Sequence, residues 1–275
     1  MAAAKTTQAE KAQRFQALHA RPEVFVIPNP WDPGSARLLE AIGFQALATT
    51  SAGYAFSLGK LDGQVGLDDM IEHCRALCAA TGLPVSADLE NGYADDPKAA
   101  AQALVRGAEA GLVGGSIEDF SGDPAKPIYD FTLAVERVEA AVEAVRKLPF
   151  HFTFAARADA LIHNAKDMDD TIRRLQAFEA AGADVLYAPG LKTLEEVKRV
   201  CSAVKKPVNV NMTSLPQATL AQLGEAGARR ISTGGALARA TIGTLLAAGR
   251  EMQSPGTFTW ASGATSGAEL KKLLG

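Results

Sequence analysis

Acidic side chains end two apolar runs of the sequence, and an arginine ends a third. Asp88 and Glu90 alternate with apolar residues in one run, Glu118 closes the next, and Arg157 follows a third. Carboxylates brought close together raise one another's pKa unless a cation compensates their charge. An all-oxygen ligand set without histidine suits Mg²⁺, or Mn²⁺, better than zinc. We therefore predict a divalent-metal site at Asp88, Glu90 and Glu118, with Arg157 beside it.

The alternation of side chains along these runs supports the convergence. Successive residues of a strand point to opposite faces, so residues two apart share a face. The same rule gives other runs a polar inner face. The inward sets are Ser86, Asp88 and Glu90; Ser116 and Glu118; Thr153, Ala155, Arg157 and Asp159; and Asn209, Asn211 and Thr213. A carboxylate–arginine network that only joins strands is the alternative to a functional site.

Eight apolar runs alternate with helical patterns and would position these side chains. Four runs start just after a proline, and four follow a glycine that closes a helix, in strict alternation. The prolines are Pro22, Pro84, Pro149 and Pro207, and the glycines are Gly43, Gly111, Gly182 and Gly227. The helical patterns cover 36–42, 67–80, 98–110, 133–147, 168–180 and 194–204. Eight strand–helix units predict an α/β fold of the (β/α)8 TIM-barrel type, whose active sites lie at the carboxyl ends of the strands.

Composition sets the class of molecule. The 275 residues are 47% apolar and 21% charged with a net charge of −3, which is ordinary for a globular enzyme and offers no basic surface for nucleic acid or membranes. We expect a single barrel domain over 1–275, with an extra helix in 1–20 and a tail at 251–275. The absence of an apolar leader or a membrane span predicts a cytoplasmic protein.

Three smaller features allow two interpretations each. Cys74 and Cys78 lie four residues apart on a predicted helix, where packing is favoured over metal binding. Gly234-Gly235 opens the last helix and could either bind phosphate or only form a turn. His163 follows Arg157 in a loop, where it could either reach substrate or, the favoured interpretation, be a surface histidine.

Several segments, in this order, resemble the isocitrate lyase/phosphoenolpyruvate mutase superfamily between about Val24 and Arg250. The segments are Asn29-Pro30-Trp31-Asp32, Thr50-Ser51 through Leu58-Gly59 to Asp62, Ser86 to Tyr93, Ile117-Glu118-Asp119, Ala156 to Ala160, and Asn211-Met212-Thr213. The resemblance implies a barrel whose last helix is swapped between subunits in a homo-oligomer, commonly a tetramer. It also implies Mg²⁺ bound directly by Asp88, with Glu90 and Glu118 acting through water.

The resemblance further implies roles for individual residues. Arg157, Asp62 and Glu118 form the expected catalytic set, with Arg157 steadying an enolate. The expected substrate-binding set is Thr50, Ser51, Gly53, Tyr54, Asp88, Arg157, Asn211 and Thr213. A metal and a guanidinium directed at the enolate oxygen would stabilise the charge left when a bond beside a 2-oxo or 2-hydroxy carboxylate breaks.

The loop after the fourth run departs from the lyases of this superfamily, which carry a Lys-Lys-Cys-Gly-His segment there. Residues 120–127 contain neither cysteine nor histidine, and Ala188-Pro189 stands where lyases tend to carry glutamate. We predict a Mg²⁺-dependent lyase that cleaves a C–C bond, by decarboxylation for example, in a small 2-oxo or 2-hydroxy (di)carboxylate. A phosphonopyruvate hydrolase or mutase acting on a P–C bond, and a catalytically idle barrel that binds 2-oxo acids, are the alternatives.

Overall fold

The computed structural model describes residues 6–165 and 167–275, and its strands form one parallel eight-stranded sheet. The strands are β1 (Phe25–Ile27), β2 (Leu47–Ala48), β3 (Val85–Asp88), β4 (Gly114–Glu118), β5 (Thr153–Arg157), β6 (Val185–Tyr187), β7 (Val208–Asn211) and β8 (Arg230–Ser232). The order β1-β8-β7-β6-β5-β4-β3-β2 leaves β1 and β2 as the end strands. The Ala48 amide donates to the Pro28 carbonyl at 3.1 Å, which joins these two ends. The predicted (β/α)8 barrel is confirmed.

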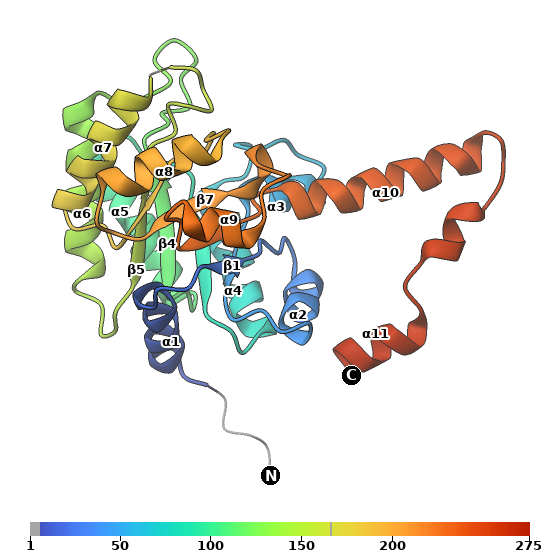
Figure 1. Cartoon of the computed structure of the whole chain (residues 1–275). Helices are drawn as coiled ribbons and strands as arrows, with labels where there is room; N and C mark the ends of the chain where they lie inside the picture. Colours follow the sequence, from blue (N-terminus) through green and yellow to red (C-terminus); the bar gives the residue numbers. More distant parts are fainter. Residues whose placement is uncertain (1–5, 166) are drawn as a thin grey trace.

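Helices follow the strands around the outside of the barrel (Figure 1). They are α2 (Pro33–Ala41), α4 (Leu67–Ala80), α5 (Pro97–Glu109), α6 (Phe131–Val145), α7 (Met168–Ala180), α8 (Leu194–Ala203) and α9 (Leu220–Glu225). The sequence pattern predicts α4 and α7 residue for residue. A short helix, α3 (Ser51–Ser57), was not predicted and begins directly after β2, with Thr50 as its N-cap.

Glycine and proline mark the entry of successive strands, as the sequence indicates. Gly43, Gly111, Gly182 and Gly227 have φ between +101° and +110°. This left-handed backbone is open to glycine at little cost and ends the helix before each even-numbered strand. Pro84 and Pro207 directly precede β3 and β7, where a missing amide hydrogen is tolerated.

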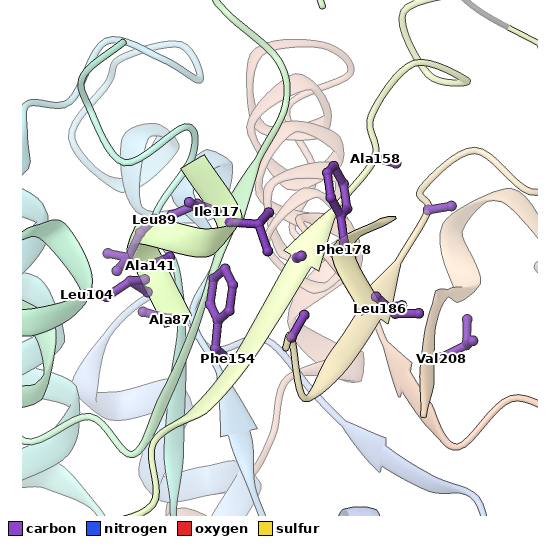
Figure 2. Packing of buried hydrophobic residues seen from close by; sticks show 14 of the residues in the cluster. Ala87, Leu89, Leu104, Ile117, Ala141, Phe154, Ala158, Phe178, Leu186 and Val208 are labelled. Atoms are coloured by element: carbon purple, nitrogen blue, oxygen red, sulfur yellow. The ribbon is translucent and has the colours of Figure 1, made fainter. Parts of the chain in front are cut away.

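Apolar side chains fill the layer between the strands and the outer helices. Ile117 and Phe154 point outward from β4 and β5, and they pack with Leu104 of α5 and Phe178 of α7 in one buried cluster (Figure 2). Burying each such side chain contributes roughly 1.5–3 kcal/mol. Since the outward faces of the strands are bound to the helices in this way, the inward faces are left for polar residues.

A second apolar cluster closes the amino-terminal end of the barrel. Helix α1 (Gln8–Ala20) contributes the fully buried Phe15, which packs with Phe25 and Ile27 of β1. The predicted extra helix is therefore present in 8–20, while residues 1–5 of that prediction lie outside the described residues.

The carboxyl-terminal part leaves the barrel. Helix α10 (Ala236–Gln253) projects from the body, and the chain then returns through a short helical turn to α11 (Gly267–Leu274), which lies near α2 (Figure 1). Helix α10 continues past residue 250, so the tail predicted from 251 begins three residues later. Ser266 caps α11 by accepting from the Glu269 amide. In the described part of the chain, no helix is long and apolar enough to cross a bilayer.

Candidate active site

A cavity of about 460 Å³ opens at the carboxyl ends of the strands. Residues from all eight strands or from the segments that follow them line it. The polar residues among them include Asn29, Thr49, Thr50, Ser51, Asp62, Ser86, Asp88, Glu90, Ser116, Glu118, Arg157, Asp159, His163, Tyr187, Asn209, Asn211, Arg230, Ser232 and Arg239. The carboxylates and the arginine predicted to converge therefore do so.

Arg157 organises the acidic side of this cavity. Its Nη1 lies 2.7 Å from Asp88 Oδ1, and its Nη2 lies 2.8 Å from Glu118 Oε2 and 2.7 Å from Asp159 Oδ2. The Arg157 side chain is only 12% exposed, and its Cζ stands 5.1 Å from the centre of the Tyr187 ring. One guanidinium thus holds acids from β3, from β4 and from the segment after β5.

These acids make the site strongly negative. Burial and then the charges of Asp88 and Asp62 raise the pKa of Glu90 to about 7. Burial also raises the pKa of Glu118, against the lowering effect of Arg157. Desolvation and the nearby Asp88 raise the pKa of Asp62 in the same direction. One arginine does not compensate this group of carboxylates, so a further cation would be stabilised here.

Asp88 has one oxygen on Arg157 and the other at the start of α3. Its Oδ2 accepts from the Ser51 hydroxyl at 2.9 Å and from the Ser51 amide at 3.4 Å. The Thr49 hydroxyl accepts from the Asp88 amide at 3.0 Å, which fixes the end of β3 beside β2. Ser51, which was expected to bind substrate, therefore directs both its hydroxyl and its N–H to Asp88.

Glu90 follows β3 in an unusual conformation. Its φ of 46° and that of Tyr93, 60°, are left-handed, although neither residue is glycine. The Tyr93 hydroxyl donates to Glu90 Oε1 at 3.1 Å, and the Glu118 amide donates to the Glu90 carbonyl at 2.9 Å. The strained turn bends Glu90 toward the cavity, as sparsely populated backbone often does at functional sites.

The donor set suits a hard cation bound mainly through water. Within the described residues, no three His, Cys, Asp or Glu side chains form a ready ligand cage. Asp88 and Glu118 contact Arg157, and Glu90 contacts Tyr93, so the predicted three-ligand set is not preassembled. Mg²⁺ usually takes one or two carboxylates and keeps several waters, so carboxylates facing a polar cavity fit it chemically.

The remaining predicted residues divide into two groups. Asp62 and Asn211 line the cavity, and Asn211 Nδ2 donates to the Tyr187 hydroxyl at 3.2 Å. Three others lie outside its lining. Tyr54 stacks on His73 with ring centres 3.8 Å apart. Gly53 packs closely on Thr50, since a Cβ at position 53 would stand 2.5 Å from Thr50 Cγ2. Thr213 is exposed, and its hydroxyl donates to Asn211 Oδ1.

His163, for which a surface position was favoured, is partly exposed in the loop after β5. It lines the cavity, with its ring stacked on that of Phe120 at 3.8 Å and 3° between the planes. Burial lowers the pKa of His163, so the ring is largely neutral near pH 7. The loops after β4 and β5 therefore meet over the site through an aromatic pair, which no local pattern of either loop signals.

Asp159, which was predicted to point inward, is only 1% exposed and is a main partner of Arg157. Sequence reasoning missed two other residues of the cavity. Asn29 Oδ1 accepts from the amides of Thr233 and Gly234, which fixes the turn after β8. Arg230 lines the cavity from β8. Period-two alternation around the outward-facing Ile231 could have identified Arg230.

A buried network supports the loop after β4 from behind. Asp119 accepts from the Asp159 amide at 2.7 Å and from Arg174 Nη1 at 3.1 Å. The Tyr129 hydroxyl donates to Asp95 at 2.5 Å and also accepts from Asn91. The segments that follow β3, β4 and β5 are therefore bound to one another.

Comparison with known proteins agrees with this geometry. Residues 15–253 match the family model described as phosphoenolpyruvate phosphomutase. A solved structure from Burkholderia cenocepacia J2315, provisionally described as a lyase/mutase, is 52% identical with a TM-score of 0.94, over 96% of this chain and 95% of its own.

Two relatives have named activities. The 2-methylisocitrate lyase of Shewanella oneidensis is 30% identical over 78% of this chain and 76% of its own. The structure of 2,3-dimethylmalate lyase, described as a member of the PEP mutase/isocitrate lyase superfamily, is 26% identical with a TM-score of 0.85, over 96% of this chain and 95% of its own. The chain therefore belongs to the phosphoenolpyruvate phosphomutase family, within the isocitrate lyase/PEP mutase superfamily.

Proposed function

We propose that this protein is a Mg²⁺-dependent lyase that breaks a C–C bond in a small 2-oxo or 2-hydroxy carboxylate by way of an enolate. The observation that carries the proposal is the buried Arg157 among Asp88, Glu118 and Asp159 at the wall of a polar cavity. Relatives named 2-methylisocitrate lyase and 2,3-dimethylmalate lyase support C–C cleavage as the reaction class.

The protein's own residues would position and stabilise the reacting atoms. Arg157 is fixed by three acids, so its guanidinium is oriented before substrate arrives and can face a developing enolate oxygen without reorganisation. Asn211 lies on the cavity wall as a hydrogen-bonding group for the substrate's polar atoms, while Ser51 holds Asp88 in place.

Asp88 would hold Mg²⁺ directly, with Glu90 and Glu118 binding through water. Bound there, the ion would polarise the substrate oxygen and offset the negative charge that bond cleavage leaves. The raised pKa of Glu90, about 7, results from burial and from neighbouring carboxylates, and it marks this position as one that favours added positive charge.

The loop after β4 offers the leaving fragment no cysteine. Phe120 stacks on His163 at the cavity, and the Lys126 side chain is paired with Asp130 and 64% exposed. Loss of CO₂ requires no acid to protonate the departing group, so decarboxylation of a 2-oxo dicarboxylate is the reaction that best fits the residues of this loop.

Turnover of a substrate panel tests the proposal. The panel is oxaloacetate, isocitrate, methylisocitrate, substituted malates and phosphonopyruvate, each with Mg²⁺ and with EDTA, and the products are identified by NMR. We expect metal-dependent cleavage of a C–C bond in one of the carboxylates. Equal rates of turnover with Mg²⁺ and with EDTA would refute the metal requirement. Turnover of none of the carboxylates would refute the assignment as a lyase of small carboxylates.

Two observations favour the P–C alternative. Arg239 lines the cavity beside Gly235, where its guanidinium could face a phosphoryl group, and a B. cenocepacia structure provisionally described as a phosphonomutase is 33% identical. Phosphate release from phosphonopyruvate, without cleavage of any carboxylate in the panel, would establish this alternative.

We also propose that α10 is exchanged between subunits of a homo-oligomer. The helix projects from the barrel (Figure 1), and Leu245, Met252 and Trp260 line one surface hollow, with Leu245 68% exposed. An exposed apolar patch of this kind is typical of an interface. We expect sedimentation to show an oligomer, a tetramer in the proposed form, and Leu245→Glu to give smaller particles.

A further inference from the structure

A second arginine lines the same cavity at greater depth. Arg230 begins β8, two residues before Ser232 on the inward face, and pairs in register with Phe25 of β1 and Asn209 of β7. Phe25 belongs to the apolar cluster that closes the amino-terminal end of the barrel. Arg230 is 5% exposed and lines the cavity, so it forms part of the floor.

The hydrogen-bond partners of Arg230 are neutral. Its Nε donates to Asn209 Oδ1 at 2.8 Å, and its Nη1 lies 3.5 Å from His19 Nε2. Burial and the charge of Arg230 lower the pKa of His19 to about 3, so this imidazole is uncharged near pH 7. Burial lowers the pKa of Arg230 to about 10, which leaves the guanidinium charged.

No acid among the described residues forms an ion pair with Arg230. Three acids of the cavity, Asp88, Glu118 and Asp159, are bound to Arg157 instead. Of the described side chains, Tyr187 is the one whose charge acts on the pKa of Arg230, and it is a neutral phenol at pH 7. Buried charges in proteins are normally paired, because an unpaired one loses hydration without compensation.

Small polar side chains line the same cavity as this guanidinium. Ser86, Ser116 and Ser232 are buried and line the cavity on its inward faces. The Ser232 hydroxyl accepts from Asn209 Nδ2 at 3.0 Å, which leaves its own hydrogen free to donate. A guanidinium and a hydroxyl donor facing a polar space form a binding site for an anion.

The geometry points to an anion subsite on the cavity floor, in which Arg230 and Ser232 bind one carboxylate group or a small free anion. For a dicarboxylate substrate, the subsite would hold the carboxylate remote from the reacting bond, and this part of the inference rests on the proposed function. A free halide from solution is also an anion that a guanidinium and a hydroxyl can bind, so it is the second possible source of the negative charge.

Two ligands of equal chain length show the effect of a second carboxylate on binding. Succinate and butyrate both have four carbons and differ by one carboxylate, and neither is expected to react. By calorimetry we expect the wild type to bind succinate about tenfold or more tightly than butyrate, because a charge-assisted pair commonly reaches this size. Arg230→Gln should remove the difference. Arg229→Gln removes an equal charge from the neighbouring, outward-facing position and should retain it.

Bromide provides an independent readout on the unaltered protein. In crystals soaked with sodium bromide, we expect an anomalous peak within about 4 Å of the Arg230 guanidinium, the usual limit for an ion pair. Sodium bromide should also raise the melting temperature relative to sodium gluconate at equal ionic strength, and Arg230→Gln should abolish the rise.

The outcomes distinguish the two sources. Succinate selectivity that depends on Arg230 and is weakened by bromide identifies a substrate carboxylate, while a bromide peak without succinate selectivity identifies a free anion. Absence of both in the wild type overturns the inference, even if Arg230→Gln does not fold. All of these readouts are binding measurements, so they are independent of whether the C–C lyase reaction is found.

Discussion

Two buried arginines line one cavity, and their surroundings are opposite. Arg157, on the side of β3 to β5, touches three carboxylates at 2.7–2.8 Å. Arg230, on the side of β7 and β8, touches an amide and a neutral imidazole. The first charge is balanced within the chain, and the second is not balanced by any described residue.

The difference separates two uses of the same side chain. A guanidinium fixed by acids is held in one place and can orient reacting atoms. A guanidinium held by neutral acceptors keeps its attraction for an incoming anion. The acidic side therefore suits a cation and the chemistry, whereas the β7–β8 side suits a negative group of the ligand.

The largest expected effect is on the acidic side. Asp88→Asn keeps the shape of the side chain but removes the proposed direct ligand of Mg²⁺. Since metal stabilisation of several kcal/mol is lost, we expect kcat/KM to fall by about a thousandfold. Steady-state kinetics on the best panel substrate measure this fall, with Mg²⁺ titrated for each protein.

Asp68→Asn is the matched control, because Asp68 is an acid on the outer surface, 90% exposed, that pairs only with Arg106. It should leave kcat/KM within a factor of two. A thousandfold loss in both variants would show that the acidic side is not special.

The next effect compares the two arginines by stability. Arg157→Met leaves three acids without their partner, and removing one partner of a buried pair costs about 3–5 kcal/mol. Arg230→Met removes a charge that has no acidic partner, so we expect the free energy of unfolding to change by less than about 1 kcal/mol. Urea unfolding of both variants measures the contrast, and equal losses would contradict it.

A third, smaller effect concerns His19, which faces Arg230. Its pKa is lowered from 6.5 to about 3 in the folded state, so the unfolded chain binds more protons between these values. Stability therefore falls as the pH drops below about 6.5. His19→Gln should flatten this decline by about 1 kcal/mol per pH unit.

Urea unfolding at pH 6, 5 and 4 gives the two slopes. In Arg230→Met, the pKa of His19 should be higher, because one of the lowering charges is gone, and the decline should be shallower than in the wild type. Parallel curves for all three proteins would refute the assignment to His19.

The smallest effect lies behind the acidic side. Tyr129→Phe removes the hydroxyl that links Asp95 to Asn91 in the segment after β3. We expect a loss of about 1 kcal/mol in the free energy of unfolding. Substrate KM should rise more than kcat falls, since the loops after β3 and β4 are tied together by this hydroxyl, and an unchanged KM would count against that link.

The barrel and its acidic side were predictable, because long periodic helices and period-two strands carry strong signals. Helix α3 was not predictable. Its seven residues contain Gly53 and show no apolar periodicity, so the segment before Gly59 has the same sequence pattern as an irregular loop. The tail was predicted to begin at residue 251, shortly after Gly249, whereas α10 continues to its C-cap at Ser254.

The positions of several side chains of the cavity depend on contacts between residues far apart in the chain. His163 reaches the cavity by stacking on Phe120, forty-three positions earlier, and Asp159 is placed by Arg157 and Asp119 together. The inward position of Arg230 could have been predicted from period-two alternation. Two adjacent arginines, Arg229 and Arg230, suggest a solvent-exposed segment until Ile231 is assigned to the outer apolar layer.

The regular strand entries divide the barrel into equal parts. A left-handed glycine stands before each even-numbered strand and a proline before each odd-numbered one, so the repeating unit contains two strands and two helices. Asp88 and Glu118 fall within one such unit, and Asn209 and Arg230 fall within another. A change confined to one unit would therefore alter one side of the cavity and leave the residues of the other side in place.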